Sequence, residues 1–312
     1  MLQQNESSAI LENASRVVVG KARVLELLVV ALLAEGHVLL EDVPGLGKTL
    51  MAKALARSMG GSFRRIQFTP DLLPSDVTGF SVYDQKSGEF VFHPGPVMSN
   101  VLLADEINRT IPRTQASLLE SMGEFQVTVD GHTMDLPRPF FVIATQNPIE
   151  MDGTFPLPEA QLDRFLMRID LGYPDKAEEL AILERFRQDD PLVTLEAVST
   201  PEQIVQLQKQ RSMVLVPASV REYIADLTGA TRVHPQVRYG ASPRGSLGLM
   251  KASQALAAVR GRSFVTPDDV KELAPAVLTH RIILRHEERA KGASASEIIE
   301  GILERVPVAS PV

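Results

Sequence analysis

The sequence has 312 residues and contains neither cysteine nor tryptophan. The missing cysteine excludes disulfides, cysteine-ligated zinc, iron–sulfur clusters and thiol nucleophiles, so any metal must bind oxygen or imidazole ligands. Lys and Arg total 32 against 39 Asp and Glu, and this net charge of −7 argues against a generally basic surface for nucleic acid. The longest early apolar run, residues 27–34, is too short to span a bilayer, and the first ten residues do not resemble a secretory leader. We therefore expect a cytoplasmic protein without a membrane span or a nucleic-acid partner.

Hydrophobic patterning predicts two parts. Residues 37–40, 101–104 and 140–144 are short apolar runs bounded by polar residues, which is typical of parallel strands covered on both faces. After Tyr173-Pro174 the pattern is helical, and Pro, Gly and Asp-Pro mark the boundaries. We predict an α/β core over residues 1–189, whose parallel sheet is flanked by helices, and a small all-helical domain over residues 190–312.

Two hairpins are expected to project from the sheet domain. Residues 80–92 alternate in polarity around a Lys86-Ser87-Gly88 tip, and residues 126–136 contain the tight-turn pair Asp130-Gly131.

The strongest chemical signal is DVPGLGKT at residues 42–49, between an expected strand and an expected helix. Its glycines allow backbone N–H groups to surround phosphate oxygens at a helix N-terminus, Lys48 reaches the β and γ phosphates, and the Thr49 hydroxyl binds Mg²⁺. The general phosphate-loop pattern begins with glycine, whereas this sequence has Asp42. The segment predicts a site for ATP or ADP with Mg²⁺.

Polar residues follow two of the expected strands. Asp105 and Glu106 end the run at 101–104, where Asp105 can hold Mg²⁺ with Thr49 and Glu106 can orient and deprotonate the attacking water. Asn147 follows the run at 140–144, and its uncharged amide can hydrogen-bond the γ-phosphate or that water. Alone, each pattern is also typical of an ordinary solvated strand end or turn.

In this order the motifs resemble those of AAA+ ATPases, and longer strings resemble the MoxR family, whose members are similar in having aspartate at the first phosphate-loop position. The resemblance covers about residues 18–284 and includes FTPDLLPSD (68–76), DEINR (105–109), ATQNPIE (144–150), PLPEAQLDRF (156–165) and GASPR (240–244). It implies that Arg164 acts as an arginine finger on the neighbouring subunit's nucleotide and that Arg244 acts as sensor 2 from the helical lid. It also implies that residues 18–20 line the adenine pocket. The expected nucleotide contacts are Val18, Val19, Gly20, Asp42, Val43, Pro44, Gly45, Leu46, Gly47, Lys48, Thr49 and Leu50.

The resemblance implies a Mg²⁺-dependent ATPase that forms a ring, expected to be a hexamer, and remodels or matures client proteins. Proteins of the MoxR family often act with a partner that has a von Willebrand factor A domain, and they help to insert metals or cofactors. The resemblance therefore implies such a partner and such a role. The first alternative is a nucleic-acid motor or loader, against which the net charge of −7 weighs. The second is a nucleotide-regulated scaffold without turnover, which the presence of Glu106 and Arg164 disfavours.

Overall fold

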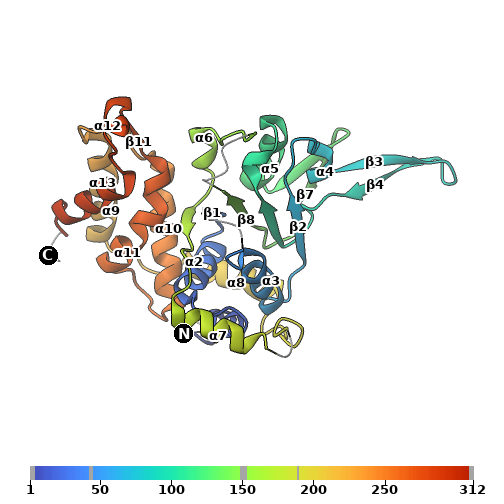
Figure 1. The fold of residues 1–312 in the computed structure, drawn as a ribbon, viewed down its shortest axis with the longest axis horizontal. Helices are drawn as coiled ribbons and strands as arrows, with labels where there is room; N and C mark the ends of the chain where they lie inside the picture. The colour runs from blue at the N-terminus through green and yellow to red at the C-terminus, as the bar shows by residue number, and fades with distance from the viewer. Residues whose placement is uncertain (1–3, 42–44, 148–152, 188–189, 309–312) are drawn as a thin grey trace.

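The computed structural model describes residues 4–41, 45–147, 153–187 and 190–308. Its centre is a five-stranded parallel sheet (Figure 1), which confirms the predicted fold class. In spatial order the strands are β2 (Phe63–Gln67), β5 (Val101–Asp105), β8 (Phe141–Gln146), β1 (Val38–Glu41) and β9 (Met167–Asp170). The two outer strands were not predicted, because β2 is largely exposed and β9 alternates, so neither is a continuous apolar run.

Alternate side chains of the central strands enter two apolar clusters, one on each face of the sheet. Val38 and Leu40 face the first cluster, whereas Leu39 faces the second. The first cluster receives α1 (Gln4–Ser15), α2 (Ala22–Leu33) and α3 (Lys48–Ser58). The second receives α4 (Pro74–Thr78) and α5 (Pro112–Glu124). The result is a three-layer core whose inner strands are buried on both faces.

The chain beyond the core is mainly helical, as predicted. It comprises α8 (Pro201–Arg211), α9 (Ala218–Val233), α10 (Pro243–Val259), α11 (Pro267–Leu278), α12 (His286–Ala290) and α13 (Ala295–Arg305). One correction is needed, because a short antiparallel pair, β10 (Val237–Tyr239) and β11 (Ile283–Leu284), joins these helices. Strands of three and two residues are too short to produce a recognisable alternation.

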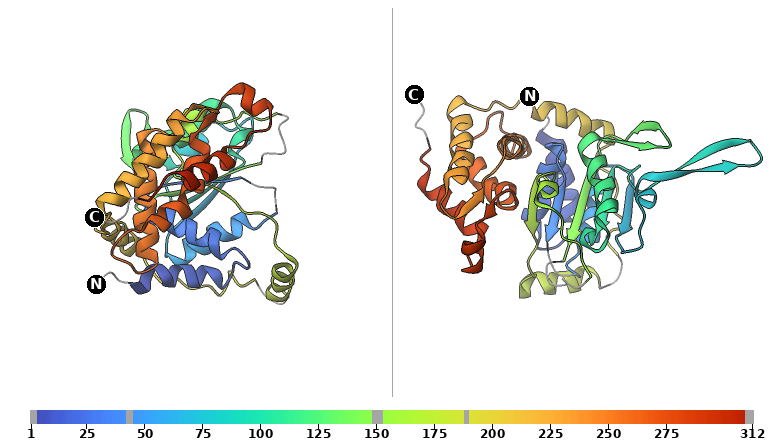
Figure 2. Two further views of the ribbon diagram at one scale, coloured as in Figure 1. Left: turned by 90° about the vertical axis from the view of Figure 1, so that its left-hand side faces the viewer. Right: turned by 90° about the horizontal axis from the view of Figure 1, so that it is seen from above.

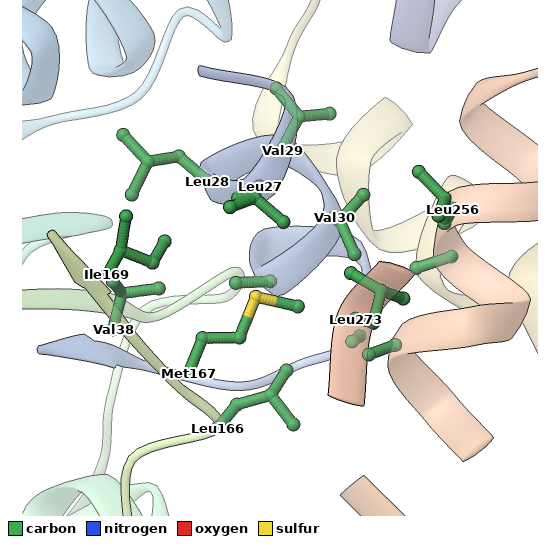
Figure 3. Close-up of a cluster of buried hydrophobic side chains, with 14 of the residues drawn as sticks. Leu27, Leu28, Val29, Val30, Val38, Leu166, Met167, Ile169, Leu256 and Leu273 are labelled. Atoms are coloured by element: carbon green, nitrogen blue, oxygen red, sulfur yellow. The ribbon is translucent and has the colours of Figure 1, made fainter. Parts of the chain in front are cut away.

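The helices from α8 onward, called the lid below, pack on the core through α2. Figure 3 shows Leu27 and Val30 of α2 between Met167 of β9 and Leu256 and Leu273 of the lid helices. A single apolar cluster therefore runs from the sheet through α2 into the lid. The predicted division at residue 189 lies at residues outside the described ranges and stays a prediction. None of the described helices has the length and apolarity needed to traverse a bilayer.

Both predicted hairpins are present and leave the same side of the core (Figures 1 and 2). The longer consists of β3 (Gly79–Asp84) and β4 (Glu89–Pro94), and the shorter of β6 (Gln126–Val129) and β7 (His132–Asp135). Asp130 and Gly131 have positive φ angles of 51° and 80°, which gives the tight turn that this pair predicts.

Two histidines are buried where helices meet the sheet. His280 follows α11 and is buried against the core, where its Nε2 lies 3.1 Å from the Phe165 carbonyl. His37 accepts a hydrogen bond from the Val142 N–H at Nδ1, while its Nε2 lies 3.1 Å from the Met122 carbonyl. These partners require a neutral ring with hydrogen on Nε2. Burial lowers the pKa of His37 from 6.5 to about 4.

We expect His37 to make the protein less stable in acid. The His37 ring of the unfolded chain takes up a proton as the pH falls through 6.5, but that of the folded chain does so only near 4. The contribution of neutral His37 to the free energy of unfolding is therefore complete above pH 6.5 and is lost as the pH falls from 6.5 to about 4. Denaturant unfolding should show a loss of about 2 to 3 kcal/mol between pH 7.5 and 4.5 that His37→Gln lacks. Parallel stability curves for the two proteins would contradict this assignment.

Candidate functional site

The loop between β1 and α3 begins the site. Gly45 and Gly47 have φ angles of 90° and 81°, and a Cβ added at either would meet no atom within 4 Å. Glycine is therefore required there by backbone conformation, and the loop opens onto free space at the N-terminus of α3. This geometry fits a bound phosphate. Residues 42–44 lie outside the described residues, so the structure does not describe the predicted contacts of Asp42, Val43 and Pro44.

The carboxyl ends of β5 and β8 complete a cavity of about 400 Å³. The predicted site residues that line this cavity are Gly45, Gly47, Lys48, Thr49, Leu50, Asp105, Glu106 and Asn147. Thr49 and Asp105 offer the hydroxyl and carboxylate oxygens that suit Mg²⁺. No group of three or more acidic or histidine side chains that could hold a metal occurs among the described residues, so a cation here would need further ligands from phosphate or water.

Hydrogen bonds orient both carboxylates. The Thr145 hydroxyl donates to Asp105 Oδ1 at 2.5 Å and accepts from the Glu106 N–H at 2.8 Å. Glu106 itself has a left-handed backbone, with φ 56° and ψ 50°, an uncommon conformation for a residue that is not glycine. This turn separates the directions of the adjacent carboxylates while both still line the cavity.

Strand β2 supplies partners that the sequence reasoning missed. Arg65 bonds Asp105 Oδ2 at 2.7 Å, and the Gln67 amide donates to Glu106 Oε2 at 2.6 Å. Arg109 also pairs with Glu106 Oε2, at 3.1 Å. Residues 63–67 read Phe-Arg-Arg-Ile-Gln, which is not a strict alternation, and only the register of β2 with β5, in which Gln67 lies opposite Asp105, shows which side chains reach the carboxylates.

A second, largely apolar cavity of about 150 Å³ adjoins the phosphate loop. It contains the predicted residues Val18, Val19, Leu46 and Leu50, whereas Gly20 is not among its lining residues. The opposite wall includes Ile182 and Phe186, at and just after the end of α7 (Lys176–Arg185). Their four-residue spacing could have shown that they share a helix face, although not that this face meets the loop.

Arg164 and Arg244 lie together in a third cavity, and none of the phosphate-loop residues that the structure describes lines it. Arg164 bonds the Leu119 carbonyl of α5. The acidic side chains of this cavity already have partners, because Asp163 pairs with Arg281 at 2.8 Å and Glu35 pairs with Arg211 at 3.0 Å. Burial lowers the pKa of Arg281 to about 10, although Asp163 opposes this shift.

Comparisons with known proteins agree with this geometry. The profile of the ATPase family associated with various cellular activities matches residues 37–167, and an AAA lid domain matches residues 229–302. Chaperone MoxR1 of Mycobacterium tuberculosis is 44% identical over 93% of this chain and 79% of its own length. The chain belongs to the MoxR family of AAA+ ATPases.

Two other proteins are similar to this chain over nearly its whole length. The uncharacterised protein YeaC of Bacillus subtilis is 54% identical over 95% of this chain and 93% of its own length. A crystal structure of a "putative ATPase" from Cytophaga hutchinsonii is 41% identical and has a TM-score of 0.93, over 98% of this chain and 96% of the other. The predicted family and ATPase activity are therefore confirmed.

The apolar cavity yields a test of base binding. Ile182→Asn should weaken binding of a fluorescent ATP analogue roughly fivefold to tenfold, because it places an amide where an adenine ring would need apolar contact. Leu180→Asn, an exposed position on the same helix, serves as the matched control. Equal affinities for the two variants would show that the base binds elsewhere.

Proposed function

We propose that the protein is a Mg²⁺-dependent ATPase whose active site is completed by a second copy and whose hydrolysis cycle remodels client proteins. The observation that carries this proposal is the separation of the site residues. Lys48, Asp105 and Glu106 line one cavity, whereas Arg164 and Arg244 line another. Cations that serve phosphoryl transfer must reach the nucleotide, so we infer that these arginines serve a neighbouring subunit.

Within one subunit, Lys48 and the loop N–H groups bind the β and γ phosphates. Thr49 and Asp105 would hold Mg²⁺, which supplies charge neutralisation between those phosphates when bound. Glu106 orients water and accepts its proton, and Asn147 hydrogen-bonds the γ-phosphate or the same water. The Gln67 amide donates a hydrogen bond to one oxygen of the Glu106 carboxylate. This bond limits rotation of the carboxylate and so orients it for the attacking water.

Across the proposed subunit boundary, Arg164 and Arg244 stabilise the charge on the transferring phosphoryl group. Their guanidinium groups suit this role because each presents several N–H donors in a planar fork. The arrangement supports a sensor 2 role for Arg244 across this boundary. It lies with Arg164 and away from its own phosphate loop, so its lid acts on the neighbour's nucleotide.

A heterologous contact of this kind forms a ring when its rotation closes, and we propose a closed ring of six subunits. The name of the MoxR1 relative, a chaperone, supports protein clients. We propose metal or cofactor insertion as one form of their maturation. A partner with a von Willebrand factor A domain and a cytoplasmic location stay predictions. Co-purification from native extract would identify the clients.

Lys48→Ala and Glu106→Gln should fail at different steps. The first should lose nucleotide binding, because Lys48 contacts the ground-state phosphates, whereas the second should bind ATP normally and hydrolyse it at least about 100-fold more slowly. Calorimetric ATP titration and phosphate release measure the two effects separately. Normal turnover by Glu106→Gln would remove this residue from the role of base.

Mixing two inactive variants tests the shared site. Lys48→Ala and Arg164→Ala should each be nearly inactive, since loss of an arginine finger costs on the order of a thousandfold in rate. An equimolar mixture should regain ATPase activity at interfaces that pair an intact Lys48 site with an intact Arg164. Energy transfer between labelled subunits confirms their exchange.

If the subunits exchange and activity stays absent, Arg164 acts within its own subunit or several intact neighbouring sites are needed at once. Dilution of Arg164→Ala into wild type separates these outcomes. A proportional fall in activity indicates independent sites, and a steeper fall indicates coupling around the ring.

A further inference from the structure

The longer hairpin exposes apolar side chains that the nucleotide site does not use. Cross-strand pairing of Tyr83 with Phe90 and of Ser81 with Phe92 places these four side chains on one face of β3–β4. The rings of Tyr83 and Phe90 meet edge to face, with centroids 5.4 Å apart, yet Phe90 is 74% exposed. Such an aromatic pair on a projecting ribbon is typical of an interaction surface.

The shorter hairpin presents a matching face. Val127 pairs with Met134 and Val129 pairs with His132, so these side chains also share one face of β6–β7. A cavity of about 620 Å³ separates the hairpins, and its walls include Phe90 and Phe92 on one side and Val129 and Met134 on the other. We call this space the hairpin cleft. Both hairpins extend from the same side of the core (Figure 2).

The two hairpins carry charge of one dominant sign. Asp130 lines the cleft. Residues 79–94 and 126–135 contain three more acidic residues, Asp84, Glu89 and Asp135, whose strand pairing places them on the hairpin faces opposite to the cleft. Lys86, at the tip of β3–β4, is the only lysine or arginine in these two ranges. The walls therefore favour apolar surface in a ligand, and the acidic residues of the surrounding hairpins, here called the rim, favour positive charge.

We propose that the hairpin cleft binds an extended polypeptide segment in which apolar side chains lie next to lysine or arginine. The inference rests on the proposed protein-remodelling function and specifies its client class. Each hairpin is a separate two-stranded sheet, so strand edges are available to pair with an extended chain. The hairpins of a second copy fit less well, because they have the same acidic excess and would repel.

Three fluorescent peptides of equal length test the proposal by anisotropy, with the full chain in Mg²⁺ and a nonhydrolysable ATP analogue. The first alternates Leu with Lys, the second alternates Leu with Glu, and the third alternates Ser with Lys. The Leu–Lys peptide should bind at least about tenfold more tightly than either of the others, because only it satisfies both the walls and the rim.

Variants locate the binding surface. Phe90→Ser should weaken binding of the Leu–Lys peptide about tenfold, whereas Phe264→Ser, at a partly exposed lid position, should have no effect. Glu89→Gln combined with Asp130→Asn should weaken binding roughly threefold to tenfold at low salt, and less at high salt. Asparagine tolerates the positive φ of residue 130, and Glu222→Gln combined with Asp226→Asn, at exposed positions of α9, is the matched charge control.

Equal binding of the Leu–Lys and Leu–Glu peptides, or unchanged affinity in Phe90→Ser, would overturn the proposal. The proposal would also be overturned if the wild type binds no peptide and Phe90→Ser loses ATP-dependent assembly. That result would assign the hairpin surface to contact with a second copy. Basal ATP hydrolysis by Phe90→Ser should match the wild type. Failure of the shared ATPase site would appear in the subunit-mixing assay, which does not depend on peptide binding.

Discussion

Parallel pairing of β1, β8 and β5 is the constraint on which the nucleotide site depends. Because the three strands run in the same direction, the segments after them emerge at one edge of the sheet. The phosphate loop, Asp105 with Glu106, and Asn147 therefore line one cavity although they are far apart in the sequence. Thr145 links two of these strand ends by bonding both Asp105 and the Glu106 backbone.

The contact between lid and core determines where the second set of cations lies. Arg281 is buried and bonds Asp163 as well as the carbonyls of Phe165, Leu166 and Val277. A charged group that is removed from water needs such a complete set of partners. These contacts hold the lid beside the segment that contains Arg164, and Arg244 lies in the same cavity. The packing that secures the lid thus keeps Arg244 away from its own phosphate loop.

Local signals made much of the core predictable. Gly45 and Gly47 need positive φ, buried strands need continuous apolar runs, and Thr266 caps α11 by accepting from the Asp269 N–H. The two hairpins were predictable because alternation and tip residues are local as well. The edge strands β2 and β9 were not, since a strand with an exposed side or a mixed pattern lacks the apolar continuity of its buried neighbours.

Residue types and short spacings were enough to predict the family, the phosphate loop, the carboxylates Asp105 and Glu106, and the amide of Asn147. The folded structure was needed to show that Arg65 and Gln67 hold the carboxylates, and that Ile182 faces the phosphate loop. It also decided the burial of His280. These features depend on strand register and on how helices dock, which arise from contacts between segments distant in the chain.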